Sequence, residues 1–305
     1  MRSQPLIECV PNVSEGQNQT VIDALADVVA GCAGVALLHV DSDPDHHRSV
    51  LSFAGEPDAV AQGAFALAEA ALKQIDLRQH RGVHPRMGAL DVLPFVPLDG
   101  ATMDQCVALS QTVGQRIGDA LQLPVYLYGA AASTPARRNL AHIRGGQFEG
   151  FFEKIKDPAW APDFGPQRVH PSAGVCAVGA RLALIAFNVT LGTDDVRVAQ
   201  QIARQVRESS GGLAAVKALG FALKSRGIVQ VSMNLTDYGR TSLFEAFERV
   251  AECAEQSGVQ VLDSEIVGLV PLRALADTAR FYLRLETFSH EQVLEEKVFK
   301  AFSKG

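Results

Sequence analysis

The sequence contains few of the residues that hold small secreted or zinc-binding folds together. Its five cysteines stand far apart, at positions 9, 32, 106, 176 and 253, and no C-x-x-C pair occurs. An odd and scattered set argues against both a disulfide framework and a thiolate zinc site. We therefore expect isolated thiols, most of them buried in the core.

A strong charge of one sign and long apolar runs are also missing. Lys and Arg number 28 against 34 Asp and Glu, which gives a net charge of −6 at pH 7. This balance disfavours a nucleic-acid or anionic-membrane partner. Apolar runs such as Leu182 to Phe187 are too short to span a bilayer, and Glu8 interrupts the first one, so no signal-peptide core is found. We expect a cytoplasmic protein with no membrane or nucleic-acid partner.

Short β-rich runs alternate with long amphipathic stretches over 305 residues, about twice the ~150-residue average for one domain. The N-terminal half is expected to contain, in order, strand Leu6–Pro11, helix Asn18–Ala30, strands Val35–Val40 and Arg48–Phe53, helix Pro57–Ile75, strand Val92–Val96, a helix capped by Thr102 and Gln105, and strand Val125–Tyr128. The C-terminal half repeats a β-α-β-β-α-β succession over strand Leu182–Val189, helix Asp194–Glu208, strands Ala218–Leu223 and Val229–Leu235, helix Ser242–Gln256 and strand Gln260–Val267. These orders predict an α+β fold with two ferredoxin-like (βαββαβ) subdomains, residues 1–179 and 180–305, of which the N-terminal one is elaborated.

The segment Gln147–Gly174 is rich in proline and glycine, and we expect it to form neither a regular helix nor a central strand. It is either a linker or a functional loop, and it contains the only tryptophan, Trp160. Its stretch from Asp163 to Gly174 could pack a planar heterocycle, or it could simply cover a seam between domains. The preceding basic residues Arg137, Arg138, His142 and Arg144 are expected to lie on a solvated helix face.

A second basic segment, Arg78 to Gly88, contains three arginines and two histidines within nine residues and no acid. This density in an acidic chain suggests an anion site. Pro85 favours an extended conformation at His84, which would hold the imidazole as a fixed catalytic group. The alternative is a solvated basic loop. Asp91 follows as a possible partner that orients the imidazole, or as an ordinary carboxylate at a strand edge.

The segment His39 to Arg48 has six potential metal ligands within ten residues but no known ligand spacing. A divalent metal site is one interpretation. Another is that Asp41 and Arg48 bind complementary ends of an amino-acid-like substrate. For Asp43, Asp45, His46 and His47, a solvated turn is the favoured interpretation.

Several irregular strings of the sequence together resemble one family, the glutamate formimidoyltransferases. The strings are Glu8 to Gly16, His84 to Val92, Pro124 to Gly129, Trp160 to Pro166 and Val267 to Leu272, within a match from about residue 6 to about residue 285. The resemblance implies transfer of a formimidoyl group from N-formimidoyl-L-glutamate to N5 of tetrahydrofolate, with release of L-glutamate. It also implies two ferredoxin-like subdomains with a ligand cleft between them, a homodimer, and tetrahydrofolate as co-substrate without a metal or redox cofactor.

The resemblance also implies roles for individual residues. His84 is the expected general base, and Asp41 and Arg48 are expected at the formimidoylglutamate site. Independently of the resemblance, Arg86 in the same basic segment is expected to bind a substrate carboxylate, since a guanidinium group binds a carboxylate through two parallel hydrogen bonds. The stretch expected to bind folate consists of Gly165, Pro166, Gln167, Arg168, Val169, His170, Pro171, Ser172, Ala173 and Gly174.

Three other functions are left open by the sequence. N-formyl-L-glutamate could be the donor, which would give 5-formyltetrahydrofolate. The chain could be a folate-binding module without catalysis, or a metal-dependent hydrolase that uses the cluster from Asp41 to His47. No cyclodeaminase region follows residue 305, so we expect another protein to process the product.

Overall fold

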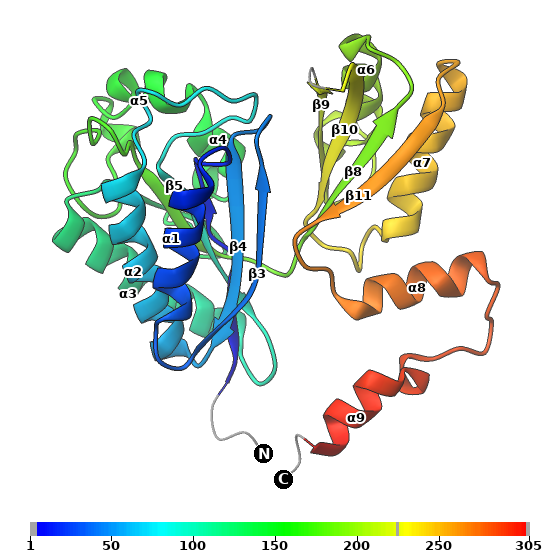
Figure 1. The fold of residues 1–305 in the computed structure, drawn as a ribbon, viewed down its shortest axis with the longest axis horizontal. Coiled ribbons are helices and arrows are strands. Elements are labelled where there is room, and N and C mark those ends of the chain that lie inside the picture. The colour runs from blue at the N-terminus through cyan, green and yellow to red at the C-terminus, as the bar shows by residue number, and fades with distance from the viewer. Residues whose placement is uncertain (1–4, 224–225, 303–305) are drawn as a thin grey trace. The chain divides into compact units, whose positions relative to one another are not determined.

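The computed structural model describes residues 5–223 and 226–302, and the chain divides after Leu182 into two compact units (Figure 1). Each unit combines one β-sheet with helices, so the predicted α+β class is confirmed. None of the helices in the described ranges is long and apolar enough to cross a bilayer.

The sheet of the N-terminal unit has seven strands: β1 (Ile7–Cys9), β2 (Asn12–Val13), β3 (Val35–Asp43), β4 (Arg48–Gly55), β5 (Leu90–Pro97), β6 (Val125–Gly129) and β7 (Cys176–Ala180). Strands β1 and β2 are two pieces of one path, and both pair antiparallel with β4 and β5. Strand β3 lies beyond β4, and β7 pairs in parallel with β5 and β6. The first residues of β4, β5, β6 and β7 therefore lie at the same end of the sheet.

Three helices cover one face of this sheet: α1 (Gln19–Ala30), α2 (Pro57–Gln74) and α3 (Met103–Leu121). Asn18 caps α1, and Thr102 with Gln105 forms the predicted capping box of α3. Leu51 and Phe53 of β4 are buried in the core. Because side chains alternate along a strand, Arg48 and Val50 project from the opposite face.

A register shift in β5 alters this alternation next to Arg48. Asn12 pairs with Val92 while Val13 pairs with Leu90, so one extra residue, Asp91, stands between them as a β-bulge. Bulges redirect the side chain they carry. The carboxylate of Asp91 consequently binds Arg48 and does not point into the apolar core with the neighbouring side chains of β5.

Short helical elements follow β6: η1 (Pro135–Arg137), α4 (Leu140–Arg144), α5 (Gln147–Lys154) and η2 (Pro158–Trp160). The expectation that Gln147–Gly174 has no regular helix is wrong for its first eight residues, because the prolines that break helices begin only at Pro158. After η2 the chain is irregular, and Phe164 exchanges backbone hydrogen bonds with Val125. A side chain at Gly118 of α3 would collide with Phe164, so the glycine permits this close packing.

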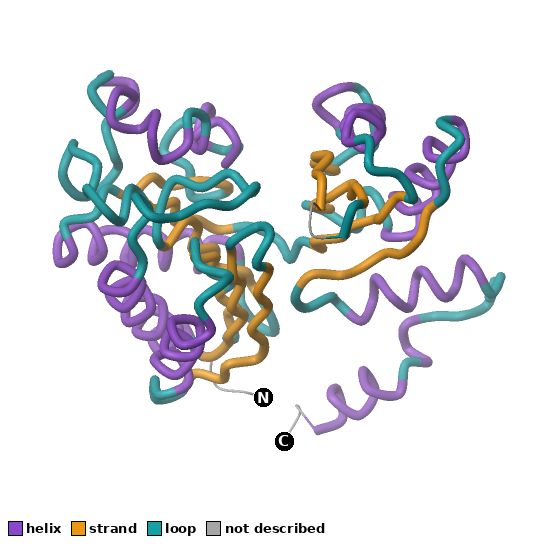
Figure 2. Tube along the Cα trace, turned by 45° about the horizontal axis from the view of Figure 1, so that its top comes forward, coloured by secondary structure: helices purple, strands orange, loops and turns teal. Residues whose placement is uncertain are grey.

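The C-terminal unit contains β8 (Ile185–Leu191), α6 (Val196–Val206), η3 (Glu208–Ser210), β9 (Val216–Leu223), β10 (Ile228–Leu235), α7 (Leu243–Gln256) and β11 (Val261–Val267). The strands form an antiparallel sheet in the order β11-β8-β10-β9, and α6 and α7 pack on one face (Figure 2). Further elements follow, α8 (Leu272–Tyr282), η4 (His290–Gln292) and α9 (Leu294–Phe302).

Candidate functional site

The site in the N-terminal unit is centred on Asp91, whose side chain is 0% exposed. Its Oδ2 accepts hydrogen bonds of 2.7 Å from both Arg48 Nη1 and Arg144 Nη2. Its Oδ1 accepts a bond of 2.9 Å from the backbone N–H of Met87. Burial by itself raises the pKa of Asp91, but the two guanidinium groups outweigh that effect and lower the pKa to about 2. Asp91 is therefore ionised at neutral pH and anchors both arginines.

The two arginines retain unused hydrogen-bond donors. Arg48 also donates from Nε to Asn12 Oδ1 at 3.0 Å. Arg144 Nε is buried, and within the described ranges it has no hydrogen-bond partner. We refer to Asn12, Arg48, Asp91 and Arg144 as the N-terminal network. Two guanidinium groups against one carboxylate leave a net positive charge and free N–H donors, which suit a carboxylate ligand.

His84 lies next to the N-terminal network. Its Nδ1 is 2.8 Å from the carbonyl oxygen of Pro85. A carbonyl only accepts, so Nδ1 carries the proton and Nε2 has the free lone pair. Burial lowers the pKa of His84 well below its ordinary value, and the nearby charges of Arg48 and Arg144 lower it further. The imidazole is consequently neutral at physiological pH and can accept a proton at Nε2.

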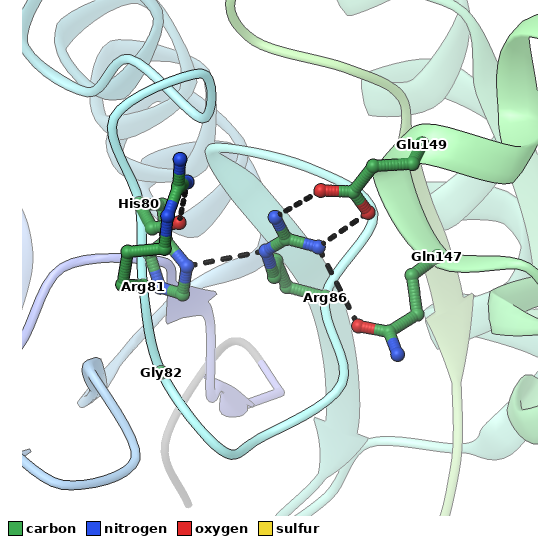
Figure 3. Close-up of a pocket in the computed structure, with 6 residues that line it drawn as sticks. All are labelled: His80, Arg81, Gly82, Arg86, Gln147 and Glu149. Carbon is green, nitrogen blue, oxygen red and sulfur yellow. Dashed lines mark hydrogen bonds and ion pairs between the residues drawn. The ribbon is translucent and has the colours of Figure 1, made fainter.

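Arg86 lines an adjacent open pocket of about 510 Å³ (Figure 3). The other residues of its lining are His80, Arg81, Gly82, Gln147 and Glu149. The guanidinium of Arg86 holds Glu149 in a fork, with Nη1 to Oε2 at 2.8 Å and Nη2 to Oε1 at 2.6 Å. Its Nε donates to His80 Nδ1 at 3.1 Å. The side chain of Arg86 is 9% exposed and that of Glu149 is 65% exposed. A buried guanidinium group therefore binds a solvent-accessible carboxylate.

The interpretation of the turn between β3 and β4 as solvated is wrong for His46 and His47, whereas the side chain of Asp43 is 46% exposed. The side chains of His46 and His47 are each only 11% exposed. His46 contacts Asp43 at 2.8 Å, whereas His47 contacts Glu15 at 3.1 Å and stacks on the ring of His80. Their ligand atoms are thus directed to separate partners. In residues 5–223 and 226–302, no group of three or more His, Cys, Asp or Glu residues could hold a metal ion.

Asp41 lies on β3 opposite Val50, and Asp43 lies opposite Arg48. Alternation places Asp41 on the same face of the sheet as Arg48. The structure therefore brings Asp41, Arg48 and His84 to one end of one face, with Arg86 in the neighbouring pocket.

The stretch expected to bind folate, residues 165–174, lies at the same end of the sheet but divides into two parts. Its last three residues pair with the two ends of the basic segment and the residues that flank it: Leu77 N–H donates to Ser172 O, Ala89 N–H donates to Ala173 O, and Gly88 bridges Gly174. Its first residue, Gly165, has φ +81° and lies against Leu123 and Gly118 beside β6. Gln167 donates to the carbonyl of Ile155.

Two arginines were expected on a solvated helix face, and for these the expectation is wrong. Arg144 belongs to the N-terminal network, and Arg137 is buried and bonds Asp163 at 2.8 Å. Lys154 holds Arg144 in place, because its Nζ donates to the carbonyls of residues 142, 143 and 145 at the end of α4. The sequence signal for both arginines is a basic cluster. It does not predict their burial, because their acidic partners Asp163 and Asp91 lie 26 and 53 residues away in the sequence.

Residues 6–181 match the family described as "Formiminotransferase domain, N-terminal subdomain", and residues 186–302 match "Formiminotransferase domain". The glutamate formimidoyltransferase of Streptococcus pyogenes serotype M1 is 47% identical over 291 residues, which cover 95% of this chain and 97% of that protein. The glutamate formimidoyltransferase of Thermoplasma acidophilum is 46% identical over 97% of this chain and 98% of that protein. The formimidoyltransferase-cyclodeaminase of Sus scrofa is 47% identical over 92% of this chain, which corresponds to 53% of that protein.

Proposed function

Because the chain belongs to the formiminotransferase domain family, we propose that it transfers the formimidoyl group of N-formimidoyl-L-glutamate to N5 of tetrahydrofolate and releases L-glutamate. The observation that supports this chemistry most directly is the neutral imidazole of His84, with its Nε2 lone pair free, beside two guanidinium groups.

The reaction requires one base that later acts as an acid. N5 of tetrahydrofolate attacks the amidine carbon of the donor, and a tetrahedral intermediate forms with a surplus proton on N5. His84 Nε2 accepts that proton and returns it to the glutamate nitrogen as the C–N bond of the donor breaks. The N5–H proton thus ends on the amine of free glutamate, and the formimidoyl carbon ends on N5. Proximity of the two bound substrates supplies much of the remaining acceleration.

The donor carries two carboxylates, and the site carries two guanidinium centres. Arg48, with Arg144 beside it, offers free donors for one carboxylate. Arg86 already binds Glu149 in the fork geometry that a substrate carboxylate would adopt. Asp41, on the same face as Arg48, binds the cationic amidine end of the donor. Residues 165–174 contact the folate co-substrate.

Other features are part of the same proposal. Both units are variants of the ferredoxin-like fold, which the strand orders β5-β1-β4-β3 and β11-β8-β10-β9 support. The protein acts as a homodimer in the cytoplasm, and light scattering coupled to gel filtration would show a single subunit mass if the dimer is wrong.

The direct test incubates the protein with tetrahydrofolate and N-formimidoyl-L-glutamate and follows both products by mass spectrometry. We expect 5-formimidoyltetrahydrofolate and L-glutamate in equal amounts. A parallel reaction with N-formyl-L-glutamate should be much slower, because the carbonyl carbon of a formamide is less electrophilic than a protonated amidine. Faster turnover of the formyl donor, or no glutamate release from either donor, would contradict the proposal.

A further inference from the structure

A second polar cluster lies in the C-terminal unit, on the face of its sheet opposite α6 and α7. Val189, Val231 and Met233 turn toward the helices and are buried in the core. The alternating positions on the other face carry Asn188 of β8 and Gln230 of β10. Glu265 of β11 pairs directly with Asn188 in the ladder. We refer to Asn188, Gln230 and Glu265 as the C-terminal network.

Two buried amides in this network hold one exposed carboxylate. Asn188 Nδ2 and Gln230 Nε2 donate to the same oxygen, Glu265 Oε1, at 3.0 and 2.9 Å. Asn188 is 5% exposed and Gln230 1%, whereas Glu265 is exposed. A surface carboxylate does not need two buried donors, so the arrangement fixes Glu265 in one orientation.

The unused atoms of the C-terminal network are hydrogen-bond acceptors. Gln230 Oε1 is buried and has no partner in the part of the chain that the structure describes. Leaving such an acceptor unpaired is unfavourable, because no hydrogen bond replaces those it makes to water in the unfolded chain. Since Glu265 uses only Oε1 toward the two amides, its Oε2 is the second acceptor. The cluster is therefore complementary to a ligand with two neighbouring N–H donors.

The two networks occupy matching places in their units. Asn12 lies on the first strand path of its unit between Val50 of β4 and Val92 of β5, next to Asp91. Asn188 lies on the first strand of its unit between Ser232 of β10 and Glu265 of β11. In both units an asparagine on the first strand adjoins an acid on the last strand of a β-α-β-β-α-β succession. The N-terminal network leaves donors free, and the C-terminal network leaves acceptors free.

We propose that the C-terminal network binds the pterin ring of tetrahydrofolate through its 2-amino-4-oxopyrimidine edge. The 2-amino group and N3–H stand on adjacent ring atoms and donate to Glu265 Oε2 and Gln230 Oε1. Phe221 of β9 pairs with Gln230 in the ladder, which places an aromatic ring on the same face for a planar ligand. This assignment rests on the proposed function for the identity of the heterocycle.

The test measures binding of pterin itself, which has no glutamate tail, by fluorescence titration of the full chain. Glu265→Gln preserves the shape of the side chain and the acceptor for Asn188 and Gln230, but it turns an N–H group toward the ligand donors. We expect pterin affinity to fall about 10- to 100-fold, as for a lost hydrogen bond to a charged group. The KM for tetrahydrofolate should rise in parallel, with the KM for N-formimidoyl-L-glutamate unchanged.

Two comparisons complete the test. 4-Oxopteridine lacks the 2-amino group, so it should bind the wild type weakly and should bind Glu265→Gln no more weakly than it binds the wild type. Glu255→Gln, at an exposed site on α7, is the matched control and should bind pterin normally. Gln230→Leu removes the buried acceptor and should also weaken pterin binding, with folding checked by circular dichroism.

The outcomes separate this inference from the proposed function. Pterin binding by Glu265→Gln equal to that of the wild type, or no preference of the wild type for pterin over 4-oxopteridine, would overturn the inference even if transfer occurs. Specific pterin binding that depends on Glu265 would support it even if no formimidoyl transfer were detected.

Discussion

The N-terminal and C-terminal networks place a carboxylate at matching positions of two sheets, but the groups that bind this carboxylate differ in charge. Asp91 is fully buried and held by two guanidinium groups. Glu265 is exposed and held by two neutral amides. The first arrangement is cationic and leaves donors free, whereas the second is anionic and leaves acceptors free. A similar strand order can therefore present opposite hydrogen-bonding requirements to two substrates.

The same difference underlies our proposal that the N-terminal network serves catalysis and the C-terminal network serves recognition. The N-terminal network has a histidine at its side, since His84 is close enough to Arg48 and Arg144 for their charges to lower its pKa. We expect changes there to affect turnover and stability, and changes in the C-terminal network to affect binding of one substrate.

The largest effect is expected for His84→Ala. Loss of a general base lowers the rate by about 10²- to 10⁴-fold. The kcat for formimidoyl transfer should fall by this factor, while the urea midpoint and the affinity for pterin stay at their wild-type values. Turnover within about threefold of the wild type would remove His84 from the mechanism.

Removal of the buried carboxylate should be costly for folding. Asp91→Ala leaves two guanidinium groups without their counter-ion, and breaking a buried ion pair in this way costs about 3–5 kcal/mol. Glu265→Ala removes the acceptor of two buried amides but leaves no unpaired buried charge, so it should cost less, about 1–3 kcal/mol. Urea denaturation of both variants measures the contrast, and equal losses would contradict the difference in burial that we describe.

Arg144→Ala should weaken donor binding. A charge-assisted hydrogen bond contributes about 1.5–3 kcal/mol, so the KM for N-formimidoyl-L-glutamate should rise about 10- to 100-fold. Arg138→Ala, at an exposed position of the same segment, is the control and should leave this KM unchanged. Arg144→Lys should recover part of the loss. A parallel rise in the KM for tetrahydrofolate would show that the change is a general distortion.

The pH dependence of transfer should reflect the lowered pKa of His84. Burial and two arginines favour the neutral imidazole, so the base form persists below pH 6.5. The acid limb of the profile of kcat against pH should therefore have its midpoint below 6.5. The same shift means that the unfolded chain binds more protons as pH falls through 6.5, so this group's contribution to stability decreases there. A midpoint above 6.5 would contradict a neutral His84.

The smallest effect is expected for Glu149→Gln. Its ion pair with Arg86 is largely exposed on the Glu149 side and stabilises the fold by about 1 kcal/mol or less. Because Glu149 occupies the guanidinium that we assign to a substrate carboxylate, its neutralisation should lower the KM for the donor by about two- to fivefold. An increased KM would indicate that Glu149 orients Arg86 rather than competing for it.

The sequence predicted much of the fold because the decisive signals are local. The capping box of Thr102 and Gln105 predicted the start of α3, and short β-rich runs predicted β4 and β10. The resemblance to the family is confirmed by the match over both units. Strand β7 was missed, because its residues Cys176 to Ala180 are small and give little β signal.

The site was only partly predictable, because its geometry depends on pairings between distant segments. The bulge at Asp91 is a property of the register between β2 and β5, which no local pattern specifies. The sequence pattern predicts that Arg144 lies on the surface, but in the structure α4 places it against Asp91. His84 was found because the proline beside it constrains the backbone and because its segment matches the family.

The ammonium of Lys154, which closes the end of α4, lies 3.7 Å from the centre of the Trp160 ring. Burial lowers the pKa of Lys154 to about 8, and Trp160 is the only tryptophan in the chain. The indole is thus an intrinsic optical reporter for the segment that presents Arg144, readable without any label. Its emission titrated through mildly alkaline pH would follow the loss of the ammonium charge, and donor added at constant pH would reveal whether this segment moves when the ligand arrives.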